Sequence, residues 1–114
     1  MEAKEIIDRS LALLGYENSE ILVKRALSAV NIIYSDLFYL SNERGFIAVK
    51  SLNDEINLEE MTLNDVMPYG VAALIAQSEN DGDNQNLYMS MYKDKRRKIG
   101  ARGQIVDCVP IPEM

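Results

Sequence analysis

Two of the side chains that enzymes most often use for catalysis are absent or rare in the sequence. It contains no histidine and a single cysteine, Cys108. Histidine is the commonest general base and metal ligand, and a cysteine nucleophile usually needs a histidine beside it. The six glycines are scattered and form no phosphate-binding loop. We therefore expect no enzymatic activity, no catalytic residue and no cofactor.

One stretch, residues 81–84 (DGDN), has the residue types of a calcium-binding loop. Such a loop has glycine at its sixth position, a ligand at its first and a bidentate glutamate at its twelfth. With Gly82 at the sixth position, the first is Gln77 and the twelfth is Tyr88. Neither of them supplies a carboxylate, so the sequence predicts a turn between helices here and no metal site.

Charge is sorted along the chain, which has a net charge of −6. Residues 51–92 carry eight acidic side chains and no lysine or arginine, whereas residues 93–102 carry six basic side chains and one acidic one. This separation suits association in which the acidic surface of one copy meets the basic surface of the next. The alternative is a solvated helix end, where cations favour the helix dipole. One short basic cluster on an acidic chain does not favour tight binding to nucleic acid.

The hydrophobic spacing predicts a mainly α fold, a four-helix bundle. Ile7, Leu11 and Leu14 recur at helical spacing within residues 3–14, and Gly15 follows as a C-cap. A second, longer helix of about six turns is predicted to start after Asn18 or Ser19, since either side chain can cap it, and to end in residues 41–45 (SNERG).

The later helices are predicted from capping residues and apolar runs. Thr62 has the character of an N-cap, but Pro68 follows soon after it, which favours a short turn and then a buried central helix from Pro68 to Ser78. Asp83 is a candidate cap for the last helix, which is predicted to run to about Ile99. Gly100 and Gly103 are expected to end regular structure.

Two segments fall outside this helical pattern. Residues 46–52 are rich in β-formers and predict a short extended excursion between the second and third helices, either a protruding loop that pairs with another subunit or a closed local hairpin. Residues 101–114 include two prolines and several apolar side chains, and predict an extended C-terminal tail beyond a bundle of residues 1–100. Fully extended, this tail reaches about 45 Å, so it docks either on its own core or on a partner.

Three stretches of the second half, residues 65–76 (DVMPYGVAALIA), 79–85 (ENDGDNQ) and 92–96 (YKDKR), resemble head–tail connector (adaptor) proteins of tailed bacteriophages. Residues 12–16 (ALLGY), 30–37 (VNIIYSDL) and 51–56 (SLNDEI) add to this resemblance, which covers most of the chain in pattern. The resemblance implies a helical subunit of a phage or prophage virion that assembles as a ring below the portal. Its partners would be other copies of itself and phage portal or tail proteins.

The resemblance gives the two unusual segments and the charge pattern a role. The residues expected at subunit interfaces are Phe46, Ile47, Val49, Leu52, Lys93, Lys95, Arg96, Arg97, Lys98, Arg102, Ile105, Val106, Val109 and Ile111. The acidic residues expected to face a channel through which DNA passes are Glu59, Glu60 and Asp65. No portal-docking motif is evident. The alternative function is a small helical protein-binding module or assembly regulator that acts as a monomer or dimer.

The expected location follows from the same features. The start of the chain is charged, and no stretch approaches the ~20 apolar residues that span a bilayer. A single cysteine offers no internal disulfide. We expect a protein of the bacterial host cytoplasm during assembly, and of the virion if it is a phage component.

Overall fold

The structure, a computed structural model, describes residues 1–41 and 45–108, with the backbone alone for residues 100–108. Its helices are α1 (Ala3–Leu14), α2 (Glu20–Leu40), α3 (Glu60–Asp65), α4 (Met67–Ser78) and α5 (Gly82–Cys108). Within the described ranges no strand forms, and the one isolated β-bridge joins Glu2 to Glu55. The predicted mainly α fold is confirmed.

The first two helices form where the apolar spacing predicts them. Ile7, Leu11 and Leu14 lie on the buried side of α1. Gly15 ends α1 at a φ of 72°, a left-handed conformation that glycine adopts without a Cβ penalty. Of the two candidate caps of α2, Ser19 is the one used, because its side chain accepts a hydrogen bond from a backbone N–H of the first turn at 3.2 Å.

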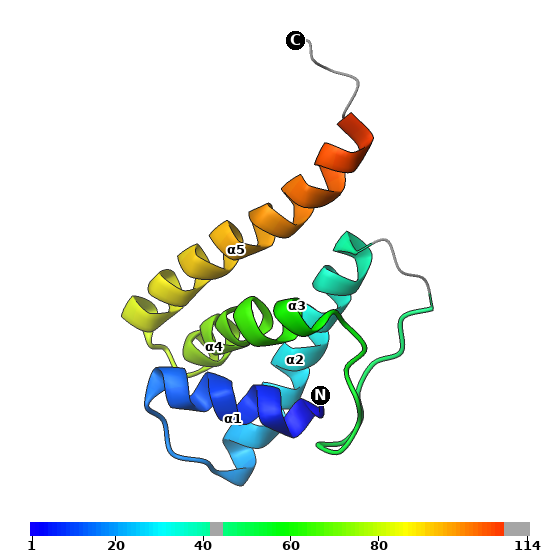
Figure 1. The fold of residues 1–114 in the computed structure, drawn as a ribbon. Helices are drawn as coiled ribbons and strands as arrows, with labels where there is room; N and C mark the ends of the chain where they lie inside the picture. The colour runs from blue at the N-terminus through cyan, green and yellow to red at the C-terminus, as the bar shows by residue number, and fades with distance from the viewer. Residues whose placement is uncertain (42–44, 109–114) are drawn as a thin grey trace.

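The central helix is α4, which packs against each of the other four helices (Figure 1). Pro68 lies in its first turn, where the missing N–H removes no helical hydrogen bond. The preceding turn is a six-residue helix, α3, which begins at Glu60. The prediction of Thr62 as an N-cap is wrong, because Thr62 lies inside α3 and is buried.

The last helix differs from its prediction at both ends. Asp81 rather than Asp83 precedes it, and the Asp81 carboxylate accepts hydrogen bonds from the backbone N–H and side-chain amide of Asn84 at 3.3 and 2.7 Å. At the other end α5 continues through Gly100 and Gly103 to Cys108. Glycine costs a helix about 1 kcal/mol relative to alanine but does not end it.

The extended tail predicted from residue 101 is therefore wrong for residues 101–108, which are helical. The same helix crosses the boundary predicted at residue 100 without a break. Residues 109–114, with Val109 and Ile111, lie outside the described residues.

The segment between α2 and α3 folds back onto its own helices. The side chain of Asn31 on α2 bonds both the N–H and the carbonyl of Val49, at 2.8 and 2.9 Å. The backbone N–H of Asn57 donates to the Tyr34 hydroxyl at 3.0 Å, and the N–H of Ile56 donates to the carbonyl of Met1 at 2.9 Å. These contacts replace the strand pairing that the sequence left open, so the segment is neither a hairpin nor a protruding arm.

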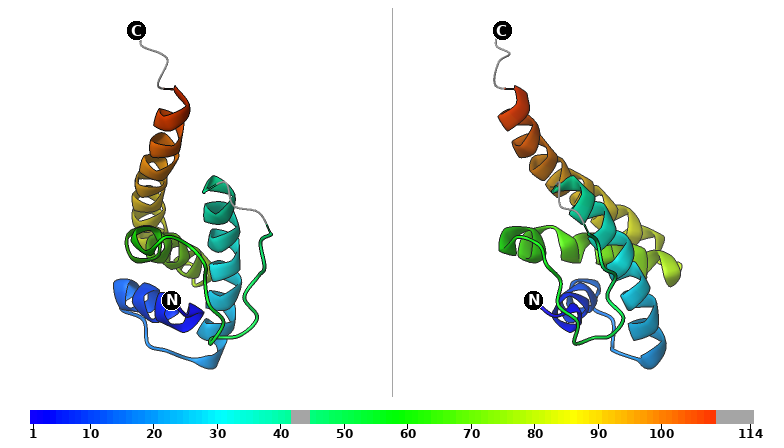
Figure 2. Two further views of the ribbon diagram at one scale, coloured as in Figure 1. Left: turned by 45° about the vertical axis from the view of Figure 1, so that its right-hand side comes forward. Right: turned by 90° about the vertical axis from the view of Figure 1, so that its right-hand side faces the viewer.

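The molecule is longer than a compact chain of its size. Its radius of gyration is 15.0 Å, whereas a globular domain of this length has about 13 Å. Figures 1 and 2 show the cause: the C-terminal part of α5 extends beyond the other helices. In the part of the chain that the structure describes, no helix is both long and apolar enough to cross a membrane.

Candidate functional site

Helix α5 is fastened to α2 by a cluster of three polar side chains. The Asp36 carboxylate of α2 accepts hydrogen bonds from Arg96 Nε and Nη2, at 2.6 and 3.0 Å, and from the Tyr92 hydroxyl at 2.7 Å. The hydrogen bond from Arg96 lowers the pKa of Asp36, although partial burial opposes it. Burial and the bond to Asp36 raise the pKa of Tyr92. The cluster positions α5, and its three side chains bond one another.

Replacing Asp36 with asparagine is expected to lower the free energy of unfolding at pH 7 by about 1 kcal/mol, a value discounted because the carboxylate and its Arg96 partner are both more than a third exposed. Since the pKa of Asp36 is lower in the folded state, its contribution is full above the ordinary value of 3.8 and is lost as the pH falls through the folded value. Urea denaturation at pH 7 and pH 3 measures both effects.

The matching control for this prediction is the pH dependence of the variant itself. The wild type should lose stability between pH 5 and pH 3 by a larger amount than Asp36→Asn does, since the variant has no carboxylate at this position to protonate. Equal losses would contradict a role for Asp36 in holding α5.

A second side of α5 is bound to α3 and α4. Lys95 Nζ lies 3.0 Å from the Asp65 carboxylate at the end of α3 and 4.7 Å from the centre of the Tyr69 ring on α4. Both contacts favour the ammonium group in this position. Lys95 and Arg96 therefore fix two sides of α5. We call the side of Lys95 the α3 flank and the side of Arg96 the α2 flank.

The predicted basic interface residues divide into two groups. Lys95 and Arg96 are used inside the chain, whereas Lys93, Arg97 and Lys98 are exposed. Arg97 pairs with Asp94, one turn before it, at 3.3 Å, and both side chains are open to solvent. The side chains of Arg102, Ile105 and Val106 lie outside the described residues.

The predicted apolar interface residues of the 45–58 segment also divide. The prediction is wrong for Val49, which is 4% exposed because the core covers it. Phe46 packs edge-on against Tyr34 and Phe38, with ring centroids 5.0 and 5.6 Å apart. Leu52 is half-buried, and only Ile47, at 76%, is largely exposed.

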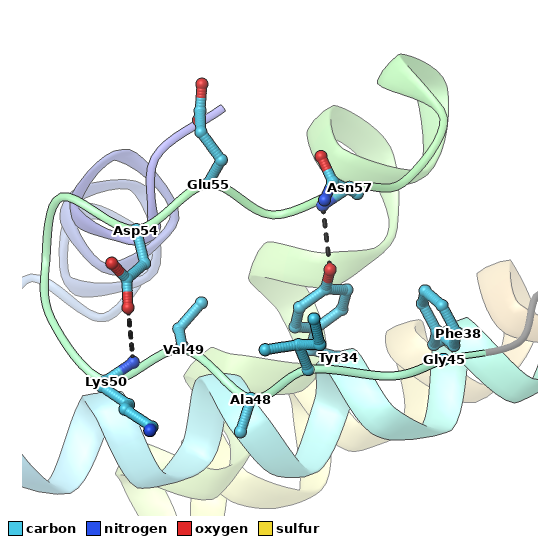
Figure 3. Close-up of a pocket in the computed structure, with 10 residues that line it drawn as sticks. Tyr34, Phe38, Gly45, Ala48, Val49, Lys50, Asp54, Glu55 and Asn57 are labelled. Atoms are coloured by element: carbon cyan, nitrogen blue, oxygen red, sulfur yellow. Dashed lines mark hydrogen bonds between the residues drawn. The ribbon is translucent and has the colours of Figure 1, made fainter.

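A groove of about 620 Å³ lies between the two arms of this segment (Figure 3). Tyr34 and Phe38 of α2 form its floor, and Lys50 and Asp54 stand at one end. The Asp54 carboxylate accepts the backbone N–H of Lys50 at 2.7 Å, which lowers its pKa. The Asp54 carboxylate thus holds the turn together.

The predicted acidic surface lies around α3. Glu59 and Glu60 are exposed at the start of this helix, and Asp65 is exposed at its end, where it pairs with Lys95. Among the described residues, Glu59 and Glu60 make no ion pair. The structure therefore brings the three predicted acidic residues onto one short element.

The sequence reasoning missed an exposed apolar stripe on α2. Ile21, Ile32 and Tyr39 are spaced eleven and seven residues apart, which places them on one side of a helix, and they are 64%, 59% and 70% exposed. The sequence prediction used only the buried apolar stripe of α2 and did not include this exposed one. The signal was present, because three large apolar side chains recur at helical spacing away from the core positions.

The described residues also contain no group of three or more acidic or cysteine side chains placed to hold a metal ion. Asp81 of the calcium-like stretch instead caps α5 and accepts a hydrogen bond from the Tyr16 hydroxyl at 2.6 Å. Comparison with protein-family models, curated proteins and solved structures finds no match for this chain.

Proposed function

We propose that this chain is a structural subunit that associates with further copies of itself, as a head–tail connector in a ring below the portal of a phage or prophage virion. The observation that carries the proposal is the α2 stripe, Ile21, Ile32 and Tyr39, which no part of the described chain covers. Exposed apolar patches of this kind mark interaction surfaces. The resemblance to phage connector proteins supplies the setting.

Two further observations support association between copies. The elongated shape leaves a large surface for neighbours, since α5 extends beyond the helices that hold it (Figure 2). The unpaired charges are also sorted, with acids at α3 and cations on α5. In a ring, the acidic surface has two possible roles: it faces a channel through which DNA passes, or it contacts the neighbouring subunit.

The double variant Ile32→Ser, Tyr39→Ser is expected to abolish assembly, since it removes two apolar contacts of the stripe. Its free energy of unfolding should change by no more than about 0.5 kcal/mol, because both side chains are exposed. Mass photometry and native mass spectrometry of the full chain, alone and mixed with the portal protein of the same genome, measure the assembly.

The matched control is Leu87→Ser, which replaces an exposed apolar side chain of α5 that is not part of the stripe. The proposal predicts assemblies of many copies for the wild type and for this control. If the wild type stays monomeric both alone and with the portal protein, the proposal is wrong. A complex of fixed small stoichiometry, one or two copies, would favour the alternative of a binding module or assembly regulator.

A further inference from the structure

Two surfaces on different sides of α5 are complementary to each other. The first, which we call the α2–α5 face, consists of Ile32 and Tyr39 on α2 and Lys93 and Arg97 on α5. The second, the α3 edge, consists of Glu59, Glu60 and Met61. We propose that the α2–α5 face of one copy binds the α3 edge of the next copy. This contact would hold together the assembly proposed above, so the inference rests on that proposed function.

The α2–α5 face is continuous across the two helices. Ile32 and Tyr39 lie four residues before and three residues after Asp36, so they flank on α2 the side chain that bonds α5. On α5, Arg96 is the residue that Asp36 holds. Successive residues are about 100° apart around a helix. Going around α5 from Lys95, the order is therefore Lys95, Arg96, Lys93 and Arg97, so that Lys93 and Arg97 lie on the side of Arg96 away from Lys95. Helical spacing thus places apolar side chains of α2 and cationic side chains of α5 beside the Asp36 cluster.

The α3 edge lies on the other flank of α5. The ion pair between Lys95 and Asp65 joins α5 to α3, as the Arg96 pair joins it to α2. Lys98 also lies on this α3 flank, beside Asp65 and Met61. The two surfaces therefore lie beside different flanks of α5.

Their chemistry matches in both charge and apolar character. Glu59 and Glu60 form no ion pair among the described residues, nor does Lys93, while Arg97 has only the exposed Asp94. Met61 is 55% exposed and adds an apolar side chain to the α3 edge, which would face Ile32 and Tyr39 of the neighbour in the proposed contact. Complementary charges at such a contact fix its register and its partner.

The contact joins different surfaces of identical copies, so it is heterologous. A heterologous contact repeats from copy to copy and closes into a ring when the rotation allows. This geometry fits a ring subunit, whereas a two-fold dimer would have to form both contacts at once between the same two copies, and the two surfaces lie on different flanks of α5. The inference assigns Glu59 and Glu60 to the subunit contact instead of the channel surface expected from the sequence.

Charge reversal tests the pairing directly in the full chain. Variant A carries Lys93→Glu and Arg97→Glu, and variant B carries Glu59→Lys and Glu60→Lys. Alone, each variant places like charges across every contact, and we expect its association to weaken at least about tenfold, measured by sedimentation velocity and by the number of copies bound to a portal ring. In an equal mixture, every A–B contact is complementary in both directions, so alternating copies should assemble as the wild type does.

Four further measurements make the outcome unambiguous. Lys4→Glu with Lys24→Glu changes the net charge by the same amount as variant A at exposed positions outside both surfaces, and should assemble normally. Circular dichroism and thermal melts check that A and B are folded, and Lys93→Gln with Arg97→Gln repeats the test without added acid. Raising the salt concentration should weaken the wild-type contact, because exposed charges are screened.

The possible results separate the inference from the proposed function. Loss of assembly in A and B with recovery in the mixture supports the contact. If A or B assembles like the wild type, or if the mixture fails to recover, the contact is wrong while the proposed function stands. If the wild type forms no assembly of many copies under any of these conditions, the proposed function fails, and the contact fails with it.

Discussion

Replacing Ile56 with alanine is expected to lower the free energy of unfolding by about 3 kcal/mol, the typical cost of truncating a fully buried isoleucine. Ile56 is only 2% exposed and belongs to the main core, although it lies in a segment without regular structure. Its backbone N–H also bonds the carbonyl of Met1 at 2.9 Å, so the side chain packs where the segment joins the start of the chain. Urea denaturation at pH 7 measures the effect.

The matched control is Ile47→Ala in the same segment. Ile47 is 76% exposed, so its truncation should change the free energy of unfolding by no more than about 0.5 kcal/mol. A loss of less than 1 kcal/mol for Ile56→Ala would contradict the packing of this segment and would restore the protruding loop that the sequence left open. The difference in stability loss between Ile56→Ala and Ile47→Ala thus distinguishes a segment packed on the core from one that protrudes toward a partner.

The helices were predictable because local signals agree with the packing. In α1 and α2, apolar spacing, a capping serine and a C-terminal glycine all point to the same boundaries, as expected of sequences whose local and global preferences are consistent. The end of α5 was not predictable in this way. Gly100 and Gly103 lower helix propensity, but a weak penalty of this kind does not decide where a helix stops.

The contacts of residues 45–58, between α2 and α3, were also not predictable from local sequence patterns. The β-forming residues of this segment correctly predict extended backbone, but the partners of that backbone are the Asn31 side chain, the Tyr34 hydroxyl and the carbonyl of Met1, all distant in sequence. No periodic pattern in the sequence predicts such contacts. A buried Val49 and an exposed Ile47 are two residues apart, so the sequence alone did not distinguish core from interface there.

The exposure of the candidate interface residues was predictable only in part, because some of their partners are also distant in sequence. Sorting of charge along the chain correctly identified exposed cations on α5 and exposed acids at α3. It did not show that Lys95 and Arg96 are used within the chain, because their partners Asp65 and Asp36 lie 30 and 60 residues away. The exposed stripe of α2 was recoverable from spacing, since a helix with two apolar stripes has more apolar surface than one core covers.

Gly70 of α4 lies against Ile33 of α2 and Tyr92 of α5, and its replacement by alanine is expected to cost about 2 kcal/mol. A Cβ atom there would lie 2.8 Å from Ile33 Cδ1 and 2.8 Å from two atoms of the Tyr92 ring. Ile33 has a flexible end that is able to yield, but the Tyr92 ring is buried and its hydroxyl is fixed by Asp36 at 2.7 Å. The overlap therefore outweighs the gain of about 1 kcal/mol that alanine brings to a helix interior.

Gly82→Ala is the matched control, because a Cβ at this first residue of α5 meets no atom within 4 Å. It should leave stability unchanged or raise it by up to about 1 kcal/mol. Thermal and urea denaturation of the two variants measure the difference. If Gly70→Ala were as stable as Gly82→Ala, α5 would not lie against α4 at this distance, and the α2–α5 face that depends on its seating would be lost with it.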